Sequence, residues 1–405
     1  MKQYDIIIIG GGAAGFFAAI NAAEMDPSAK ILILERGKEV LTKVRISGGG
    51  RCNVTHAEFI PSELIKNYPR GTKELRGPFH SFMTGDTIAW FEERGIELKI
   101  EEDGRMFPVS DSSETIVNCF QTEISRLGIR LEKNQSVTKI EPVGEMWNIT
   151  TSKGQFSAGK ILLATGSNPK IWRLLENLGH TVIPPVPSLF TFNIKDSRIK
   201  DLPGVATYAS VKVKGLKLES EGPLLVTHWG MSGPAVLKLS AWGARDLNKL
   251  DYNFTIVVNW LPQKTTEDVL EELKELKFSN AKQQVHKYTQ FVLPKRLWRS
   301  LATAAGIAEI VTWADLSRNQ LQDFAGQLTE GNFEVKGKST FKEEFVTAGG
   351  INLSEVNFKT FESKLHKNLF FAGEILNIDA ITGGFNFQNA WTGGYIAARA
   401  MTGTT

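Results

Sequence analysis

The chain has 405 residues, enough for two or three domains, and a hydrophobic fraction of 42% supports well-packed cores. Its 47 Lys and Arg residues nearly balance its 44 Asp and Glu residues, so the overall charge does not favour binding to nucleic acid or to a membrane surface. Two cysteines exclude a disulfide framework, and the N-terminal run of isoleucines is too short for a signal peptide or a membrane span, so we expect a cytoplasmic protein.

The first predicted elements are a strand, a turn and a helix. Four consecutive isoleucines at 6–9 precede the sequence GGGAAG at 10–15, and an alanine-rich amphipathic segment begins with Ala13 and Ala14. A strand buried on both faces and followed by a helix is typical of a parallel α/β sheet.

The glycines of this turn predict a dinucleotide site. Gly10 allows a sharp turn, Gly12 allows the backbone to approach a pyrophosphate, and Gly15 allows the helix to pack closely on the sheet. Glu35 follows a second apolar strand about twenty residues later, where a carboxylate can accept hydrogen bonds from ribose hydroxyls. The motif alone does not distinguish FAD from NAD.

The loop after Glu35 carries a second set of candidate ligands. They are Arg36, Lys43, Ser47, Gly48, Gly49, Arg51, Cys52 and Asn53. Because glycines keep side chains away, we expect backbone N–H groups and the Arg51 guanidinium to lie against phosphates or a flavin edge; the alternative is a flexible surface loop. Cys52 has no neighbouring cysteine, so we interpret it as a small residue packed at the cofactor rather than as a redox group.

The sequence Glu35-Arg36, followed by SGGGRCN at 47–53, resembles the BaiN-like or YhiN-like NAD(P)/FAD-dependent oxidoreductases, a family of bacterial flavoproteins. The resemblance extends from the first strand to the last helix, and it implies that the cofactor is FAD. The chain departs from the family pattern at Thr55-His56, because relatives often have Asn after the Thr.

The next segment predicts helices and hairpins. We expect helices at 86–95, capped by Asp86, and at 112–127, and we expect a hairpin turn at 103–104. Val137 lies in a short strand, and the resemblance implies that backbone groups there contact the adenine.

A further apolar strand leads into Ala164, Thr165 and Gly166. These are small residues at the carboxyl end of a parallel strand, where ligands gather. No second GxGxxG follows a strand, so we do not expect a separate Rossmann domain for NAD(P)H, and a nicotinamide donor must dock on another surface.

Prolines at 184, 185 and 187 mark a domain boundary. Beyond it, alternating apolar and polar residues at 190–217, 252–260 and 333–341 predict an antiparallel, barrel-like layer. Helices are predicted at 266–276, 281–291, 295–305 and 314–328.

This region contains a charge contrast. Residues 267–275 are rich in acids, whereas Lys282, Lys287, Lys295, Arg296 and Arg299 follow with no acid between 279 and 300. A basic face for an anionic partner such as RNA is one interpretation. We favour the other, in which these residues form ion pairs on a solvated helical surface, and we do not predict nucleic acid as a partner.

His228 is the candidate catalytic residue. It lies in a Thr-His segment followed by Ser-Gly-Pro, which resembles a segment of the family, and an imidazole titrates close enough to neutral pH to supply a proton near a flavin. The alternative is a loop in which Thr227, Gly233 and Pro234 cap the helix that starts at Ala235. No cluster of His, Cys and Asp predicts a metal site.

A third set of candidate ligands lies near the C-terminus: Gly373, Glu374, Gly384, Phe385 and Asn386. The resemblance implies that Glu374 faces the ribityl chain and that backbone N–H groups around Phe385 and Asn386 meet the pyrimidine edge of the flavin. A helix N-terminus aimed there stabilises the negative charge that develops on reduction.

The sequence therefore predicts an α/β fold with a discontinuous FAD-binding Rossmann domain of the glutathione-reductase-like type at 1–186 and 348–405. The insert at 187–347 is expected to combine a β layer (about 187–260 and 333–347) with a helical part (about 262–332). The predicted function is hydride transfer from NAD(P)H through FAD to a small unsaturated or carbonyl-bearing substrate. An RNA-modifying flavoprotein and a non-enzymatic FAD-binding redox sensor or scaffold are the alternatives.

Overall fold

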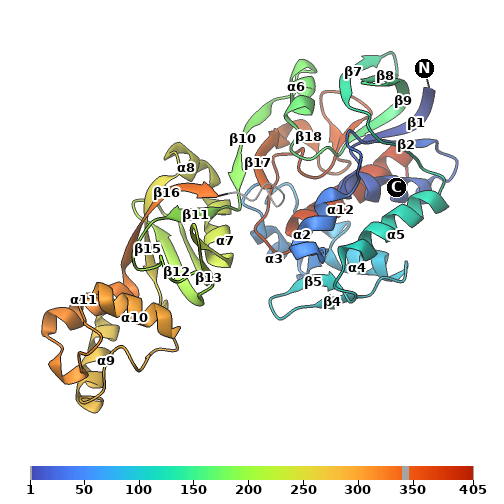
Figure 1. Ribbon diagram of the computed structural model, residues 1–405. Coiled ribbons are helices and arrows are strands. Elements are labelled where there is room, and N and C mark those ends of the chain that lie inside the picture. The colour runs from blue at the N-terminus through green and yellow to red at the C-terminus, as the bar shows by residue number, and fades with distance from the viewer. Residues whose placement is uncertain (1, 340–345, 405) are drawn as a thin grey trace. The chain divides into compact units, whose positions relative to one another are not determined.

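A computed structural model describes residues 2–339 and 346–404 (Figure 1). The chain forms two units: unit 1 comprises residues 1–186 and 342–405, and unit 2 comprises residues 187–341. The predicted β layer extends over residues 340–345, and that part of the prediction lies outside the described residues.

Unit 1 is built on a nine-stranded sheet. Its parallel centre has the order β20-β9-β1-β2-β6. The bounds are β1 (Lys2–Ile9), β2 (Ile31–Leu34), β6 (Arg130–Glu132), β9 (Gly154–Leu163) and β20 (Leu369–Phe371). Antiparallel strands extend it: β7 (Val137–Val143), β8 (Met146–Thr151), β18 (Val356–Asn357) and β19 (Glu362–Ser363). The predicted α/β fold is therefore confirmed.

Two helices of unit 1, α1 (Ala13–Met25) and α12 (Phe385–Thr402), pack against each other. A Cβ atom at Gly394 of α12 would lie 2.9 Å from the carbonyl oxygen of Ala14, so a glycine is needed for this close approach. The residues at 6–9 and 31–34 are buried, as expected for central strands of a parallel sheet.

The remaining elements of unit 1 surround this sheet. They are α2 (Thr42–Gly50), β3 (Thr55–His56), α3 (Pro61–Leu64), η1 (Ile65–Asn67), η2 (Pro78–His80), α4 (Thr84–Glu92), β4 (Leu98–Ile100), β5 (Arg105–Pro108), α5 (Ser113–Arg126), α6 (Pro169–Asn177) and η4 (Leu353–Glu355). The predicted hairpin and both predicted helices are present. Asp86 is not the N-cap of α4, however, because it lies in the first turn and accepts a hydrogen bond from the N–H of Met83.

Unit 2 contains a closed barrel with the strand order β11-β14-β13-β12-β15-β16, which confirms the predicted barrel-like layer. The bounds are β11 (Thr191–Ile194), β12 (Ala206–Val213), β13 (Glu219–Thr227), β14 (Gly230–Ser232), β15 (Asn253–Asn259) and β16 (Gly331–Ser339). Strands β13 and β14 were not predicted, although β13 has a strict alternation of buried and exposed residues. Helices α7 (Pro234–Trp242) and α8 (Ala244–Lys249) follow them.

The helical part of unit 2 contains α9 (Thr266–Ser279), α10 (Lys295–Ala304), η3 (Trp313–Asp315) and α11 (Arg318–Thr329), gathered beside the barrel (Figure 1). The helix predicted at 281–291 is wrong. The N–H of Val285 donates to the carbonyl of Val311, and the carbonyl of Val285 accepts from the Trp298 indole at 2.8 Å. These tertiary hydrogen bonds replace the local bonds of a helix.

The predicted ion pairing of the charged stretches is also wrong for the described residues. The acids of α9 use other partners: Glu272 pairs with Lys264 at 2.5 Å, and Glu271 pairs with Lys274 at 2.6 Å. No ion pair among the described residues joins α9 to the basic residues between 282 and 299.

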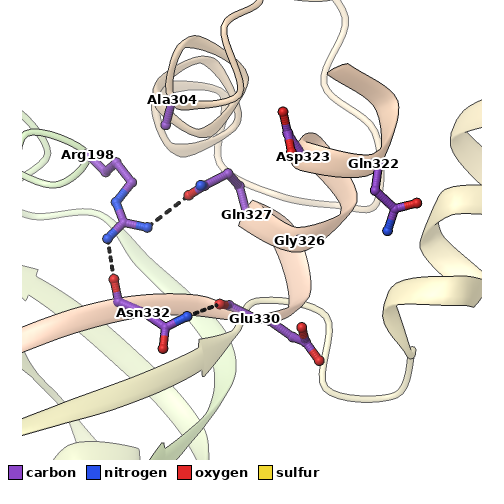
Figure 2. A pocket seen from close by; sticks show the side chains of 8 residues that line it. All are labelled: Arg198, Ala304, Gln322, Asp323, Gly326, Gln327, Glu330 and Asn332. Carbon is purple, nitrogen blue, oxygen red and sulfur yellow. Dashed lines mark hydrogen bonds between the residues drawn. The ribbon is translucent and has the colours of Figure 1, made fainter. Parts of the chain in front are cut away.

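Arg198 connects the barrel to α11 beside a polar groove of about 360 Å³ (Figure 2). Its guanidinium lies 3.9 Å from the ring centroid of Phe333, donates to Gln327 at 2.8 Å, and pairs with Asp196 at 2.7 Å. It also donates to the carbonyl of Asn332. These contacts of Arg198 hold the helical part against the barrel.

Strands β10 (Val182–Ser188) and β17 (Val346–Ile351) form a separate two-stranded sheet. Within residues 2–339 and 346–404, no helix combines the length and the apolar character needed to cross a membrane. The same residues contain no group of three or more His, Cys, Asp or Glu side chains that could hold a metal ion.

Candidate flavin site

The turn after β1 leaves open space at one glycine only. Gly10 has a φ of 116°, and a Cβ atom there would lie 2.3 Å from the carbonyl oxygen of Ala164. A Cβ atom at Gly15 would lie 2.0 Å from the carbonyl oxygen of Gly10, whereas one at Gly12 would meet no atom within 4 Å. Packing within the protein therefore requires Gly10 and Gly15, and Gly12 keeps a surface free for a ligand.

The N-terminus of α1 faces this free space without a cap. Gly12 is the N-cap residue, and the first turn contains no acidic side chain. The N–H groups of Ala13, Ala14 and Gly15 have no hydrogen-bond acceptor among the described residues. Such N–H groups, together with the helix dipole, form a site for phosphate oxygens.

Glu35 holds the other side of the turn. Its carboxylate accepts hydrogen bonds from the N–H groups of Gly11 at 2.8 Å and Gly37 at 2.6 Å. A carboxylate has about four acceptor positions, so it can also accept hydrogen bonds from ribose hydroxyls. The N–H of Gln135 donates to the carbonyl of Glu35 at 2.8 Å, which brings the start of β7, and with it Val137, to the same end of the site.

The glycine loop at the end of α2, residues 48–50, has no side chains to cover its backbone. The helical conformation ends at Ser47, whose ψ is 151°, and Gly48 and Gly49 have φ values of 58° and 70°. A Cβ atom at Gly48 would lie 2.7 Å from the ring of Phe107, whereas one at Gly49 would meet no atom within 4 Å. Arg36, which precedes this loop, is exposed.

Arg51 already has protein partners. Its guanidinium lies 3.9 Å from the ring centroid of Phe107 and pairs with Glu101 at 2.5 Å and Asp111 at 3.4 Å. The hydrogen bond that Arg51 donates to the Glu101 carboxylate raises the pKa of Arg51 above its usual value. A contact between Arg51 and a cofactor therefore stays a prediction, and it would require the guanidinium to be shared.

Cys52 is fully buried, with a φ of 63°. Burial raises the pKa of its thiol to about 12. The thiol therefore stays protonated at neutral pH, which agrees with a packing role and argues against a reactive thiolate.

Asn53 joins the glycine loop to the N-terminus of α12. In the amide orientation that satisfies both ends, its nitrogen donates to the carbonyl of Thr55 at 3.0 Å and its oxygen accepts from the N–H of Gly384 at 2.9 Å. Gly384 has a φ of 93°, and a Cβ atom there would lie 2.4 Å from the Thr55 oxygen. Two motifs that are far apart in the sequence thus form one structure.

The N-terminus of α12 is uncapped, like that of α1. The N–H groups of Phe385, Asn386 and Phe387 have no acceptor among the residues that the structure describes. The side chain of Asn386 instead binds the backbone of Ala380, at 3.0 Å through its oxygen and 3.2 Å through its nitrogen. This turn therefore offers backbone donors on a fixed support.

Lys43 and Glu374 bring two further predicted segments together, because their side chains form an ion pair at 2.5 Å. A Cβ atom at Gly166 would lie 3.9 Å from the Glu374 carboxylate, and one at Gly373 would lie 3.4 Å from the Cβ of Ala14. Residues 164–166 follow β9, and the N–H of Ala164 donates to Ile9 at 2.8 Å. The ends of β1, β9 and β20 thus meet at the N-terminus of α1.

Three side chains in this region were missed by sequence reasoning. His56 lies with Nδ1 3.1 Å from the carbonyl oxygen of Gly383, and Tyr68 donates to the carbonyl of Phe385 at 2.6 Å. Gln388 accepts from the hydroxyl of Thr55 at 2.6 Å. The departure from the family pattern at His56 was a usable signal, whereas nothing in the local sequence distinguishes Tyr68 or Gln388.

His228 lies in unit 2, at the exposed turn between β13 and β14. Thr227 forms this turn, since its hydroxyl accepts hydrogen bonds from the N–H groups of Trp229 at 3.3 Å and Gly230 at 3.2 Å. Thr227 therefore does not cap α7, whose N-cap residue is Gly233. A catalytic role of His228 stays a prediction.

The arrangement in unit 1 fits FAD. Two uncapped helix N-termini have N–H groups that could bind phosphate and a flavin ring, Glu35 has acceptor oxygens that could bind ribose, and Gly12 and Gly49 leave room for close approach. Each of these protein groups is therefore suited to a different part of the dinucleotide: phosphate, ribose or flavin ring.

Comparisons with known proteins agree with this assignment. The family model described as HI0933-like protein Rossmann domain matches residues 4–400. A protein of Haemophilus influenzae named ribosomal RNA dihydrouridine synthase is 28% identical, over 99% of this chain and 100% of its own length. A protein of Clostridium scindens named 3-dehydro-bile acid delta(4,6)-reductase is 27% identical, over 97% and 98%.

The fold also resembles a solved structure. The crystal structure of 3-ketosteroid-delta4-(5alpha)-dehydrogenase from Rhodococcus jostii aligns with a TM-score of 0.53 at 12% identity, over 99% of this chain and 97% of that one. Because the family model covers almost the whole chain and the site suits FAD, the protein belongs to the HI0933-like family of BaiN- and YhiN-like flavoproteins and is a flavin-dependent oxidoreductase.

Proposed function

We propose that this protein reduces a carbon–carbon double bond conjugated to a carbonyl group, with NAD(P)H as the electron donor. The names of the two relatives support this choice, because a 3-keto compound unsaturated at carbons 4 and 6 and the uracil ring both contain such a bond. The observation that carries the proposal is the uncapped N-terminus of α12, which suits a ring that becomes negatively charged on reduction.

Bound FAD supplies the hydride transfer, and the chain supplies position and charge. The N–H groups at the start of α1 would hold its phosphates and Glu35 its ribose, and the ion pair of Lys43 with Glu374 would border the same space. The N–H groups of Phe385 and Asn386 would bind the pyrimidine edge of its ring. Asn53 keeps this turn in place through Gly384.

NAD(P)H is proposed as a donor that docks only transiently. The sequence contains one GxGxxG that follows a strand, at residues 10–15, and FAD is assigned to it. Anaerobic titration with NADH and with NADPH tests this step through the visible absorption band of the flavin. Bleaching by one nicotinamide is expected; a flavin that neither one bleaches would contradict the choice of donor.

The acceptor is tested by mixing the reduced protein anaerobically with cyclohex-2-enone and, as the matched control, with cyclohexanone. The enone should restore the oxidised flavin spectrum and give the saturated ketone as product. The saturated control should do neither. Equal reoxidation by both compounds, or by neither of them, would contradict the proposed bond type.

A second candidate substrate is uridine in ribosomal RNA, and a specific observation favours it. The basic residues between 282 and 299 form no ion pairs with carboxylates among the described residues, although we expected such pairs. For the test, ribosomal RNA is purified from a strain that lacks this protein. The RNA is then incubated with the purified enzyme and NADPH, and its nucleosides are measured by mass spectrometry. A uridine heavier by two hydrogens would support this substrate, and unchanged RNA would count against it.

A further inference from the structure

We infer that the helical part of unit 2 carries a docking surface for the phosphate backbone of RNA. Its cations, called the basic face below, are Lys282, Lys287, Lys295, Arg296 and Arg299. All five are exposed. The inference rests on the second candidate substrate of the proposed function, and it adds the surface by which that substrate is held.

Helix α10 places three of these cations on one side. Arg299 lies four positions after Lys295 and three after Arg296, and all three are exposed, while Leu297, Trp298, Leu301 and Ala302 on the other side of the helix are buried. The helix therefore presents a row of positive charge to solvent.

The segment before α10 adds the other two cations. The carbonyl of His286 accepts a hydrogen bond from the Arg299 guanidinium at 3.1 Å, and the carbonyl of Val285 accepts one from the indole of Trp298 at 2.8 Å. The ring of His286 is itself fixed, because its Nε2 lies 2.8 Å from the carbonyl oxygen of Ile307. Lys287 follows directly, so it is held beside the same helix.

A third segment of unit 2 joins this surface. Arg296 donates to the carbonyl of Asp201, and Ser300 donates to the carbonyl of Arg198 at 2.6 Å. The loop between these carbonyls carries Lys200, which is also exposed. The basic face is therefore supported by tertiary contacts from three segments rather than by a single loop.

The basic face has a surplus of positive charge. Within the part of the chain that the structure describes, none of its five residues forms an ion pair with a carboxylate. Two of the acids of α9 are paired elsewhere, Glu272 with Lys264 and Glu271 with Lys274. Clustered like charges repel one another, and a polyanion relieves that repulsion and releases counterions on binding.

Exposed apolar groups adjoin these cations. Tyr288 is 53% exposed directly after Lys287, and Val292 is fully exposed before α10 begins. Aromatic rings between cations provide a stacking surface for unpaired bases, which a phosphate site alone does not need. This combination favours single-stranded or loop RNA over a lipid headgroup.

The test uses the full-length holoprotein and a fluorescein-labelled RNA hairpin of about 20 nucleotides with a uridine-rich loop. Fluorescence anisotropy gives the dissociation constant at several KCl concentrations between about 50 and 200 mM. The variant carries Lys282→Glu, Lys287→Glu and Lys295→Glu, because these side chains make no hydrogen bond or ion pair that folding would lose among the described residues. The matched control carries Lys153→Glu, Lys170→Glu and Lys367→Glu, three exposed lysines of unit 1, so the change in net charge is the same.

We expect the basic-face variant to bind RNA at least tenfold more weakly and its salt slope to fall by about two. The control should stay within about twofold of the unsubstituted protein. The single variant Tyr288→Ala should weaken binding about tenfold with little change in the salt slope, since stacking is not ionic.

Three results would overturn the inference: no RNA binding by the unsubstituted protein at low salt, equal losses in the variant and the control, or retention on phosphatidylglycerol vesicles in place of RNA. Reduction of the flavin by NADPH and its reoxidation by cyclohex-2-enone are measured for all proteins. Loss of these reactions in the unsubstituted protein would be a failure of the proposed function, and their preservation without RNA binding would be a failure of this inference alone.

Discussion

The imidazole of His56 stacks on the ring of Phe385, with the ring centroids 4.5 Å apart and an angle of 30° between the planes. Phe385 is the first residue of α12, and His56 also lies against the carbonyl of Gly383. One histidine thus holds the turn that faces the proposed flavin ring. It is a positioning residue, and its protonation should affect the stability of this turn.

Burial lowers the pKa of His56 below its ordinary value of 6.5, so the folded state favours the neutral ring. As the pH falls below 6.5, the unfolded chain takes up the proton first, and the free energy of unfolding therefore decreases until the pH passes the lower pKa of the folded state. His56→Phe keeps a ring but removes the titration, so the loss of stability between about pH 7.5 and 5.5 should become smaller.

Urea unfolding at several pH values checks this prediction. His180, whose pKa burial also lowers, should preserve part of the pH dependence in the variant. His80→Gln changes an exposed histidine and serves as the control. A pH dependence in His56→Phe that runs parallel to that of the unsubstituted protein would show that His56 does not contribute.

Gly12→Val should weaken cofactor binding without unfolding the protein. A Cβ atom at Gly12 meets no protein atom within 4 Å, so the new side chain enters only the space intended for the pyrophosphate. The affinity for FAD should fall at least about tenfold, and the melting temperature of the apoprotein should not change. Gly77→Val is the control, because a Cβ atom there also meets nothing. Stoichiometric FAD in purified Gly12→Val would refute the assignment of the turn.

Both thiols should resist alkylation in the native protein. Cys52 is fully buried with a pKa of about 12, and burial raises the pKa of Cys119 to about 11. Iodoacetamide at about pH 8 should label neither cysteine until urea unfolds the chain, as mass spectrometry can show. Cys52→Ala should keep its FAD and its reduction by nicotinamide. Rapid labelling of Cys52 in the folded protein would restore the redox interpretation.

Arg198→Met should destabilise unit 2 by about 2 to 4 kcal/mol, because it removes the ion pair with Asp196 and the hydrogen bond to Gln327 (Figure 2). Methionine preserves part of the contact with Phe333, so the measured loss reports mainly the polar contacts. Denaturant unfolding followed by tryptophan fluorescence measures the change. Lys200→Met, at an exposed neighbour, should alter the stability by less than about 0.5 kcal/mol, and equal effects of the two substitutions would contradict this role of Arg198.

The parts of the fold that were predictable are those determined locally. The burial of the isoleucines of β1 and the close packing of Gly15 on the carbonyl of Gly10 involve residues that are near one another in the sequence. The segment 281–291 could not be predicted, because its backbone binds Val311 and Trp298, which are distant in the sequence. Strand β13 differs from that segment, because its alternation of buried and exposed residues is itself a local signal for a strand.

The same distinction applies to the candidate site. Glycine motifs identify the loops, but the sequence does not reveal that the Asn53 amide binds Gly384 or that Arg51 is occupied by Glu101. Those partners lie in other elements, so only the folded chain defines them. Tyr68 is a similar case, because the hydrogen bond that its hydroxyl donates to the carbonyl of Phe385 becomes apparent only in the folded chain.

Lys43 pairs with Glu374 and Asn53 binds Gly384, so the cofactor site joins residues that are made early during translation to residues that are made much later. The ribosome makes the first glycine motifs before unit 2, and the segments that complete the cofactor site emerge only after the whole of unit 2. A nascent chain that stops before residue 369 has neither β20 nor α12 to complete the site. Loading of FAD must therefore wait until the segments that follow unit 2 have been made, and a fragment that ends before them lacks the ligand that would stabilise it.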